Sequence, residues 1–230
     1  MAEQSIRRIE FTGTGVFNPT TLGWLHRQLD EVMANESVTA VFLRGEGKNF
    51  SQGLDLEYLS AHQDVFSEFV TETMHLAARL MTLPVPVVSL VNGHAFGLGA
   101  MLALASDYAV MREDRGFFCL PEITIGMTLT VRMNALVRER MSAVAVRECL
   151  YTGAHVAASQ ALQLGIVDAI GALDELESLG TTVCEGMRGK PRHLLADLKY
   201  GQNQGLVDLL LSDAPDAPLT WSNVWPASTD

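Results

Sequence analysis

An apolar run that ends in closely spaced glycines is the feature that most constrains the fold. Residues 85–91 are mostly apolar and β-branched, which predicts a buried strand. Gly93, Gly97 and Gly99 follow, and the next residues are apolar on every side, which predicts a turn leading into a buried helix. The first amides of a helix have no acceptor within it, so this junction can hold negative charge.

Similar short runs recur along the first half of the chain. We expect further strands over residues 5–11, 38–43, 107–111 and 116–120, and helices that open at Asn18 and extend over 65–81. This alternation indicates βαβ units and a mainly parallel sheet. From Leu129 onward the pattern predicts helices alone, over 130–137, 143–150, 157–164, 173–187 and 192–211. The predicted architecture is an α/β core, residues 1–190, and a C-terminal helical segment with a tail, 191–230.

Length and charge exclude several classes of protein. The chain has 230 residues, of which 48% are hydrophobic, and this suits one globular domain with a sizeable core. A net charge of −11 argues against a nucleic-acid partner, which normally requires a basic surface. No run reaches the roughly 18 apolar residues of a membrane span, so no membrane partner is expected.

The cysteines point to a reducing compartment. Cys119, Cys149 and Cys184 are too few and too scattered for a disulfide framework or a metal site, and buried thiols are the simpler interpretation. The first eight residues lack the apolar core of a signal peptide. We therefore expect a cytoplasmic protein without a bound metal.

Three segments that follow predicted strands are candidates for a ligand site, namely 45–56, 93–101 and 120–126. Such sites gather at the carboxyl ends of strands in α/β proteins. The amides of Leu54 and Leu98 could point into a cleft there. The alternatives are a plain turn in which Asp55 caps the next helix, and a close helix–strand contact that requires glycine in the Gly97-Leu98-Gly99 turn.

Glu122 is the candidate acid–base residue. It stands between apolar neighbours at the end of a predicted strand, and a carboxyl group in an apolar cleft is shifted towards use as a general base near neutral pH. The alternatives are a helix N-cap, or an ion pair with Arg132 or Arg112.

Four motifs in order make the chain resemble the crotonase superfamily, also called the enoyl-CoA hydratase/isomerase family. The motifs are Gly45-x-Gly47-Lys48-x-Phe50-Ser51-x-Gly53-x-Asp55-Leu56, Asn92-Gly93-His94-Ala95-x-Gly97-x-Gly99, Pro121-Glu122-x-x-x-Gly126, and Thr152-Gly153 followed by Ala157-x-x-x-Ala161-x-x-x-Gly165-Ile166-Val167-Asp168. The resemblance runs from about Ile6 to Asp168. Each motif alone is weak, and their order makes the set specific.

The resemblance implies a spiral of βαβ units followed by helices that build a homotrimer or a hexamer. It also implies an acyl-CoA substrate and no separate cofactor, because coenzyme A is part of the substrate. The amides of Leu54 and Leu98 would hold the thioester oxygen as it becomes an oxyanion. The other residues expected to bind substrate are Ser51, Gly53, Asp55, Gly97, Met101 and Met127.

The residue type at position 101 distinguishes between the reactions of this family. Hydratases of the family carry a glutamate at this position and a second one in the Pro-Glu segment, whereas here only Glu122 is present. One carboxylate is sufficient to move a double bond, so the resemblance favours a 3-enoyl-CoA to 2-enoyl-CoA isomerase acting on fatty acyl thioesters. The alternatives are a hydratase, decarboxylase or thioester hydrolase of the same family, and a non-catalytic acyl-CoA-binding protein.

Several residues outside these motifs are candidates for binding the substrate or for structural roles. Lys190, Arg192 and Lys199 are candidates for binding the coenzyme's phosphates, and Asp107 is expected to satisfy buried backbone amides. Met133, like Met101 and Met127, could line an adaptable acyl pocket. We expect Trp221 and Trp225 of the tail to pack against this subunit or another.

Overall fold

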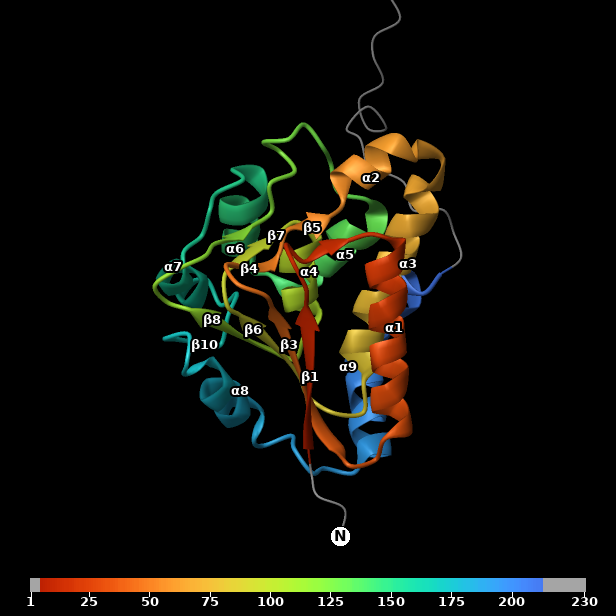
Figure 1. Ribbon diagram of the computed structural model, residues 1–230, viewed down its shortest axis with the longest axis vertical. Coiled ribbons are helices and arrows are strands. Elements are labelled where there is room, and N and C mark those ends of the chain that lie inside the picture. Colours follow the sequence, from red (N-terminus) through yellow and green to blue (C-terminus); the bar gives the residue numbers. More distant parts are fainter. Residues whose placement is uncertain (1–4, 213–230) are drawn as a thin grey trace, which may run out of the picture.

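The computed structural model describes residues 5–212, apart from the side chain of Gln63. Its main sheet has five strands, all parallel, in the order β1-β3-β6-β8-β10 (Figure 1). These are β1 (Ser5–Phe11), β3 (Val38–Gly45), β6 (Val87–Val91), β8 (Tyr108–Arg112) and β10 (Ala169–Gly171). The first four confirm predicted strands. The expectation of helices alone after Leu129 is wrong at β10, whose three residues are too few to show a strand pattern.

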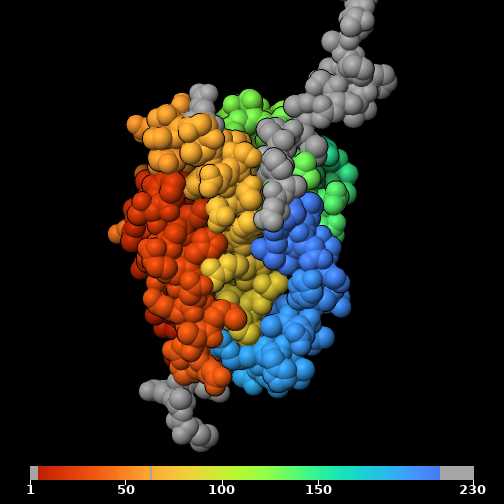
Figure 2. All heavy atoms as spheres, turned by 90° about the vertical axis from the view of Figure 1, so that its right-hand side faces the viewer, coloured from red at the N-terminus to blue at the C-terminus, as the bar shows by residue number. Residues whose placement is uncertain are grey.

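Alternating residues of β3 fill two separate cores. Val41 and Leu43 point into the main core, which α1 (Pro19–Ala34), α3 (Phe66–Thr82) and α9 (Arg192–Leu210) cover. Phe42 points to the other face, where α8 (Leu176–Cys184) covers it. The side-chain period of two along a strand is what divides the residues between the faces. Figure 2 shows α3, in yellow, lying between α1, in red and orange, and α9, in blue.

The predicted helix opening at Asn18 is confirmed. Asn18 is the N-cap of α1, its side chain accepts from the amides of Thr20 and Thr21, and the hydroxyl of Thr21 accepts from the Asn18 amide in return. Pro19 takes the first helical position, where its missing N–H has no cost. These contacts fix where α1 begins after the first strand.

Short strands beyond the main sheet bring the three candidate segments together. β4 (Asn49–Ser51), β7 (His94–Phe96) and β9 (Phe118–Cys119) form a parallel sheet, each coming soon after a strand of the main sheet, namely β3, β6 and β8. β5 (Gly53–Leu54) pairs with β2 (Val16–Phe17). The segment 45–56 therefore contains two strands, of which β4 pairs with β7 at the glycine turn and β5 pairs with β2.

The remaining described helices are α2 (Leu56–Ala61), η1 (Gln63–Val65), α4 (Leu98–Ala105), α5 (Val131–Arg140), α6 (Ala143–Val146), η2 (Arg147–Tyr151) and α7 (Ala158–Gln163). The helix predicted over 143–150 is α6 continued by η2, which is a single π-helical turn. Among the described helices, none combines the length and the apolar character needed to cross a membrane.

The C-terminal helix belongs to the main core. Leu206, Val207 and Leu210 of α9 are buried within it. The proposed division at residue 190 stays a prediction, as does the role of Trp221 and Trp225, which lie outside the described residues. Cys119, Cys149 and Cys184 are all buried free thiols, as expected.

Candidate active site

A cavity of about 70 Å³ lies where β5, the start of α4 and the segment 121–133 meet. Its lining is mostly apolar, and Glu122 is the one ionisable side chain among the described residues that line it. The other lining residues are Gln52, Leu54, Leu56, Phe66, Gly97, Leu98, Met101, Pro121, Ile125, Met127, Thr128, Thr130 and Met133. Both candidate amide residues and the candidate base thus share one cavity.

One carboxyl oxygen of Glu122 is buried without a hydrogen-bond partner. Its Oε2 atom makes no hydrogen bond, and its Oε1 atom lies 3.8 Å from the position that a Cβ atom on Gly97 would take. Burial raises the pKa of Glu122, an effect that a backbone hydrogen bond opposes only in part. A carboxyl group in this state is suited to accept and return a proton.

The alternatives considered for Glu122 are wrong. The N-cap of α5 is Thr130, and the guanidinium of Arg112 is bound to Asp114 over 2.5 Å. Arg132 is buried elsewhere and donates to the carbonyl oxygens of Leu209 and Ser212. Glu122 is therefore left facing the cavity.

A compact turn holds Glu122 in place. The carbonyl oxygen of Pro121 accepts from the amides of Thr124 and Ile125, and the Thr124 hydroxyl donates to it as well. The carbonyl oxygen of Glu122 accepts from the amide of Met127 over 2.9 Å. Because these bonds fix the backbone on both sides, the carboxyl group is held towards the cavity.

Gly97 turns the chain from β7 into α4. Its φ of 51° lies in the left-handed region, which a residue with a Cβ atom adopts only with strain. The amide of Gly97 donates to the carbonyl oxygen of Cys119, and that of Met101 donates to Gly97. Leu98 is the first residue of α4, so its amide has no acceptor within the helix.

The amide of Leu54 faces away from its partner strand. The amide of Asp55 donates to the carbonyl oxygen of Phe17 in β2, and N–H directions alternate along a strand, so the Leu54 amide points to the opposite side. A Cβ atom on Gly53 would lie 2.7 Å from the Phe96 carbonyl oxygen and 3.0 Å from the Leu98 nitrogen. The residue before Leu54 thus touches the start of α4.

Two predicted substrate-binding residues lie behind the cavity wall. The hydroxyl of Ser51 donates to the carbonyl oxygen of Gly15 over 2.6 Å and accepts from the amide of Gly53 over 3.0 Å. Asp55 caps α2 by accepting from the amide of Tyr58, which confirms the capping alternative. A Cβ atom on Gly99 would meet that of Ser51 at 2.6 Å, so the close helix–strand contact occurs at Gly99.

The prediction that Lys199 binds coenzyme phosphates is wrong. Its ammonium group is buried and bonds to Asp107 over 2.7 Å and to the carbonyl oxygen of Val85 over 3.3 Å. Asp107 also accepts from the amide of Val87, which confirms its expected role in satisfying buried amides. Arg192 donates to the carbonyl oxygens of Val32, Asn35 and Val38.

Several lining residues were not predicted from the sequence. Gln52 lies between β4 and β5, Leu56 is the first residue of α2 and Phe66 is the first residue of α3. Thr128 and Thr130 reach the cavity from the segment after Glu122. Their sequence pattern is that of ordinary loop or helix residues, so only the tertiary arrangement identifies them.

The arrangement can support proton transfer next to a polarised carbonyl. It offers one buried carboxyl group, two amides free of helical or β2 acceptors, and apolar walls. Among residues 5–212, no group of three or more histidine, cysteine, aspartate or glutamate side chains is placed to hold a metal ion.

The chain belongs to the enoyl-CoA hydratase/isomerase family, whose model matches residues 3–212. It is 32% identical over 166 residues to the peroxisomal enoyl-CoA delta isomerase 1 of Arabidopsis thaliana, covering 70% of this chain and 69% of that relative. It is 36% identical over 171 residues to a putative enoyl-CoA hydratase of Thermus thermophilus, covering 70% of this chain and 66% of the relative. The resemblance predicted from the four motifs is confirmed.

Solved structures confirm the fold. An enoyl-CoA isomerase of Mycobacterium tuberculosis superposes with a TM-score of 0.81 at 23% identity, covering 91% of this chain and 92% of that chain. A family protein from Pseudomonas syringae gives a TM-score of 0.83 at 21% identity, covering 91% of each chain. The predicted crotonase-like α/β fold is therefore correct.

Proposed function

We propose that this protein is an isomerase that converts 3-enoyl-CoA to 2-enoyl-CoA. The observation that carries the proposal is that Glu122 is the one ionisable group on the described cavity lining, with Met101 on the facing helix. Moving a double bond requires one group that takes a proton and gives it back. Three relatives in Arabidopsis thaliana that are named enoyl-CoA delta isomerases, at 31% to 32% identity, support this choice within the family.

In the first step, the carboxylate of Glu122 takes a proton from the carbon next to the thioester carbonyl. The electron pair of the broken C–H bond forms a double bond to the carbonyl carbon, and the carbonyl oxygen becomes an enolate. The amides of Leu54 and Leu98 donate hydrogen bonds to this oxygen, where they stabilise the charge as it develops. The raised pKa of Glu122 makes its carboxylate a stronger base than an exposed glutamate.

In the second step, Glu122 returns the proton two carbons further along the chain. The enolate collapses, the 2,3 double bond forms and the 3,4 double bond supplies the electron pair that takes the proton. The same carboxyl group serves both carbons on one face of the substrate, and the enzyme ends in its starting state.

The apolar lining favours this reaction over hydration. Adding water requires a group that activates it as well as one that protonates carbon. Met101 is fully buried in the cavity wall and can do neither. The relative in Thermus thermophilus named as a putative hydratase makes hydration the competing outcome to measure.

The test compares Glu122→Gln with the wild-type protein on a 3-enoyl-CoA substrate. The control is Glu113→Gln, which alters an exposed glutamate away from the cavity. Formation of the conjugated thioester is followed by its absorbance, and mass spectrometry distinguishes it from a hydrated product. We expect Glu122→Gln to lower kcat by about 10²- to 10⁴-fold while leaving acyl-CoA affinity within a few fold. A near-normal rate in this variant, or a wild-type product that is only hydrated, contradicts the proposal.

A further inference from the structure

The cavity has an open end and a closed end. Leu56 and Ile125 stand at the open end, where their side chains are 47% and 48% exposed. Met101 and Met133 are buried in the same lining, where Met101 is fully buried and Met133 is 6% exposed. A ligand that enters past the exposed pair would meet these buried thioether side chains.

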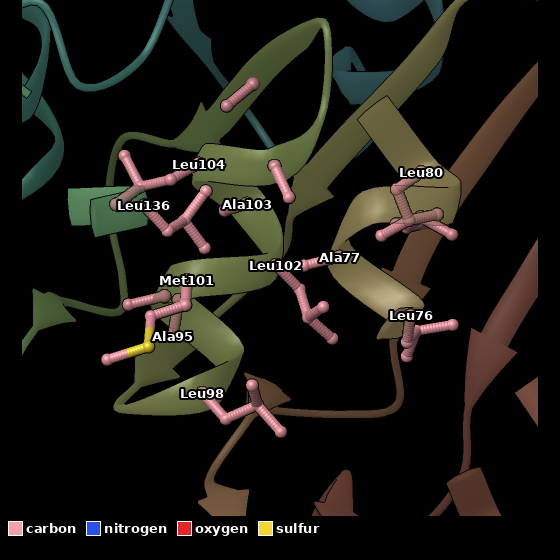
Figure 3. Packing of buried hydrophobic residues seen from close by; sticks show 14 of the residues in the cluster. Leu76, Ala77, Leu80, Ala95, Leu98, Met101, Leu102, Ala103, Leu104 and Leu136 are labelled. Atoms are coloured by element: carbon pink, nitrogen blue, oxygen red, sulfur yellow. The ribbon is translucent and has the colours of Figure 1, made fainter. Parts of the chain in front are cut away.

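The methionine end of the cavity is packed against other helices. Figure 3 shows Met101 pointing away from α3, on the side of α4 where Leu136 of α5 also lies. Leu136 is fully buried, and α5 carries Met133 as well. Two thioether side chains from neighbouring helices thus form the floor, and the packed core begins directly beneath them.

The size of the cavity limits what it can hold. Its volume of about 70 Å³ is smaller than the roughly 150 Å³ of an engineered cavity that holds benzene, so it leaves little room beyond the reacting carbons. Glu122 lines the same space, so the carbons that react must share it with the end of the acyl chain.

We infer that Met101 and Met133 limit the acyl-chain length and restrict the enzyme to short acyl groups. This inference rests on the proposed function, since it concerns the substrate of the same site. Methionine is flexible, so the floor yields a little to a longer chain, but buried neighbours such as Leu136 limit that movement.

Shortening either methionine should lengthen the preferred substrate. Replacement by alanine removes three heavy atoms, which leaves room for two or three methylene groups. Each buried methylene group contributes a factor of about four to binding. The ratio of kcat/KM for a long chain to that for a short chain should therefore rise about 15- to 60-fold in Met133→Ala or Met101→Ala.

The experiment measures kcat/KM on 3-enoyl-CoA substrates of six, eight, ten and twelve carbons. The matched control is Met74→Ala in α3, because Met74 is equally buried in the main core but does not line the cavity. We expect wild type and Met74→Ala to prefer the six- and eight-carbon chains, and both floor variants to shift towards ten and twelve. A ratio that stays within twofold of wild type in both floor variants overturns the inference, as does a wild-type preference for twelve carbons.

A second measurement separates this inference from the proposed function. Dissociation constants of saturated acyl-CoAs of the same lengths report the depth of the cavity without any reaction. If wild type converts no 3-enoyl-CoA, the proposed function fails, and these constants decide the inference alone. Tighter binding of long-chain acyl-CoAs by Met133→Ala supports the inference, and an unchanged dependence of the dissociation constant on chain length contradicts it.

Discussion

The amide of Gly97 donates a hydrogen bond to the carbonyl oxygen of Cys119 over 3.0 Å. This bond joins the residue before the Leu98 amide to the strand that ends three residues before Glu122. The amide and the carboxyl group are therefore positioned by the same backbone contact. Groups held in this way need no rearrangement when charge develops in a reaction.

The pH dependence of activity should reflect the buried state of Glu122. Burial raises its pKa, and the base must be ionised to take a proton. Activity should therefore decline, as the pH is lowered, at a higher pH than the usual glutamate pKa would give. The measurement is kcat/KM against pH, with unfolding monitored in parallel by circular dichroism. An acidic limb at or below pH 4.5 would show that the carboxyl group is not desolvated.

Glu122→Gln should stabilise the fold at neutral pH. Burial raises the pKa of Glu122 in the folded protein, so ionisation of its carboxyl group is less favourable in the folded state than in the unfolded chain. The folded protein therefore loses stability as the pH rises through the folded pKa. We expect the thermal unfolding midpoint to rise in the variant at pH 7 and to match wild type near pH 3, where the carboxyl is protonated in both states. A variant that is less stable at pH 7 would indicate an unrecognised bond to Glu122.

Gly53→Ala should impair activity far more than Gly47→Ala. Both glycines have a positive φ, of 83° and 63°, so alanine strains the backbone at either position. Only at Gly53 would the new methyl group meet the Leu98 nitrogen and the Phe96 carbonyl oxygen, whereas nothing lies within 4 Å at Gly47. We expect a loss of about 10- to 100-fold in kcat for Gly53→Ala alone. Equal kinetics in the two variants would argue that the start of α4 does not position the reacting groups.

Lys199→Met should destabilise the protein without weakening coenzyme binding. Lys199 and Asp107 form a buried pair with side-chain exposures of 7% and 13%, so removing one partner leaves the other charge buried. The expected cost is about 3–5 kcal/mol, measured by urea unfolding. Adding Asp107→Asn should recover part of it. A lower affinity for acyl-CoA in a folded Lys199→Met protein would restore the phosphate-binding hypothesis.

The sequence was sufficient to predict the strands and helices whose apolar residues recur at a clear spacing. β1, β3, β6 and α1 follow from apolar spacing and from the Asn18 cap, because these signals are local. β4, β5 and β10 have only two or three residues each, which is too short for a pattern, so they arise from pairing with neighbouring strands.

The site was predictable only where residue type limits the possibilities. Glu122 stood out because a carboxylate among apolar residues at a strand end is unusual. Lys199 did not, since a lysine on a helix normally faces water, and its burial depends on where α9 packs. The expected homotrimer or hexamer and the cytoplasmic location stay predictions.

The three strands β4, β7 and β9 have a consequence for how the protein gains activity. The groups they align come from positions 54, 98 and 122, and the strand pairings that unite them span long stretches of chain. Contacts of this kind form late, since the intervening loops must close first. Enzymatic turnover should therefore return only with the last phase of refolding, after helical content has recovered, which makes it a sensitive reporter of complete folding.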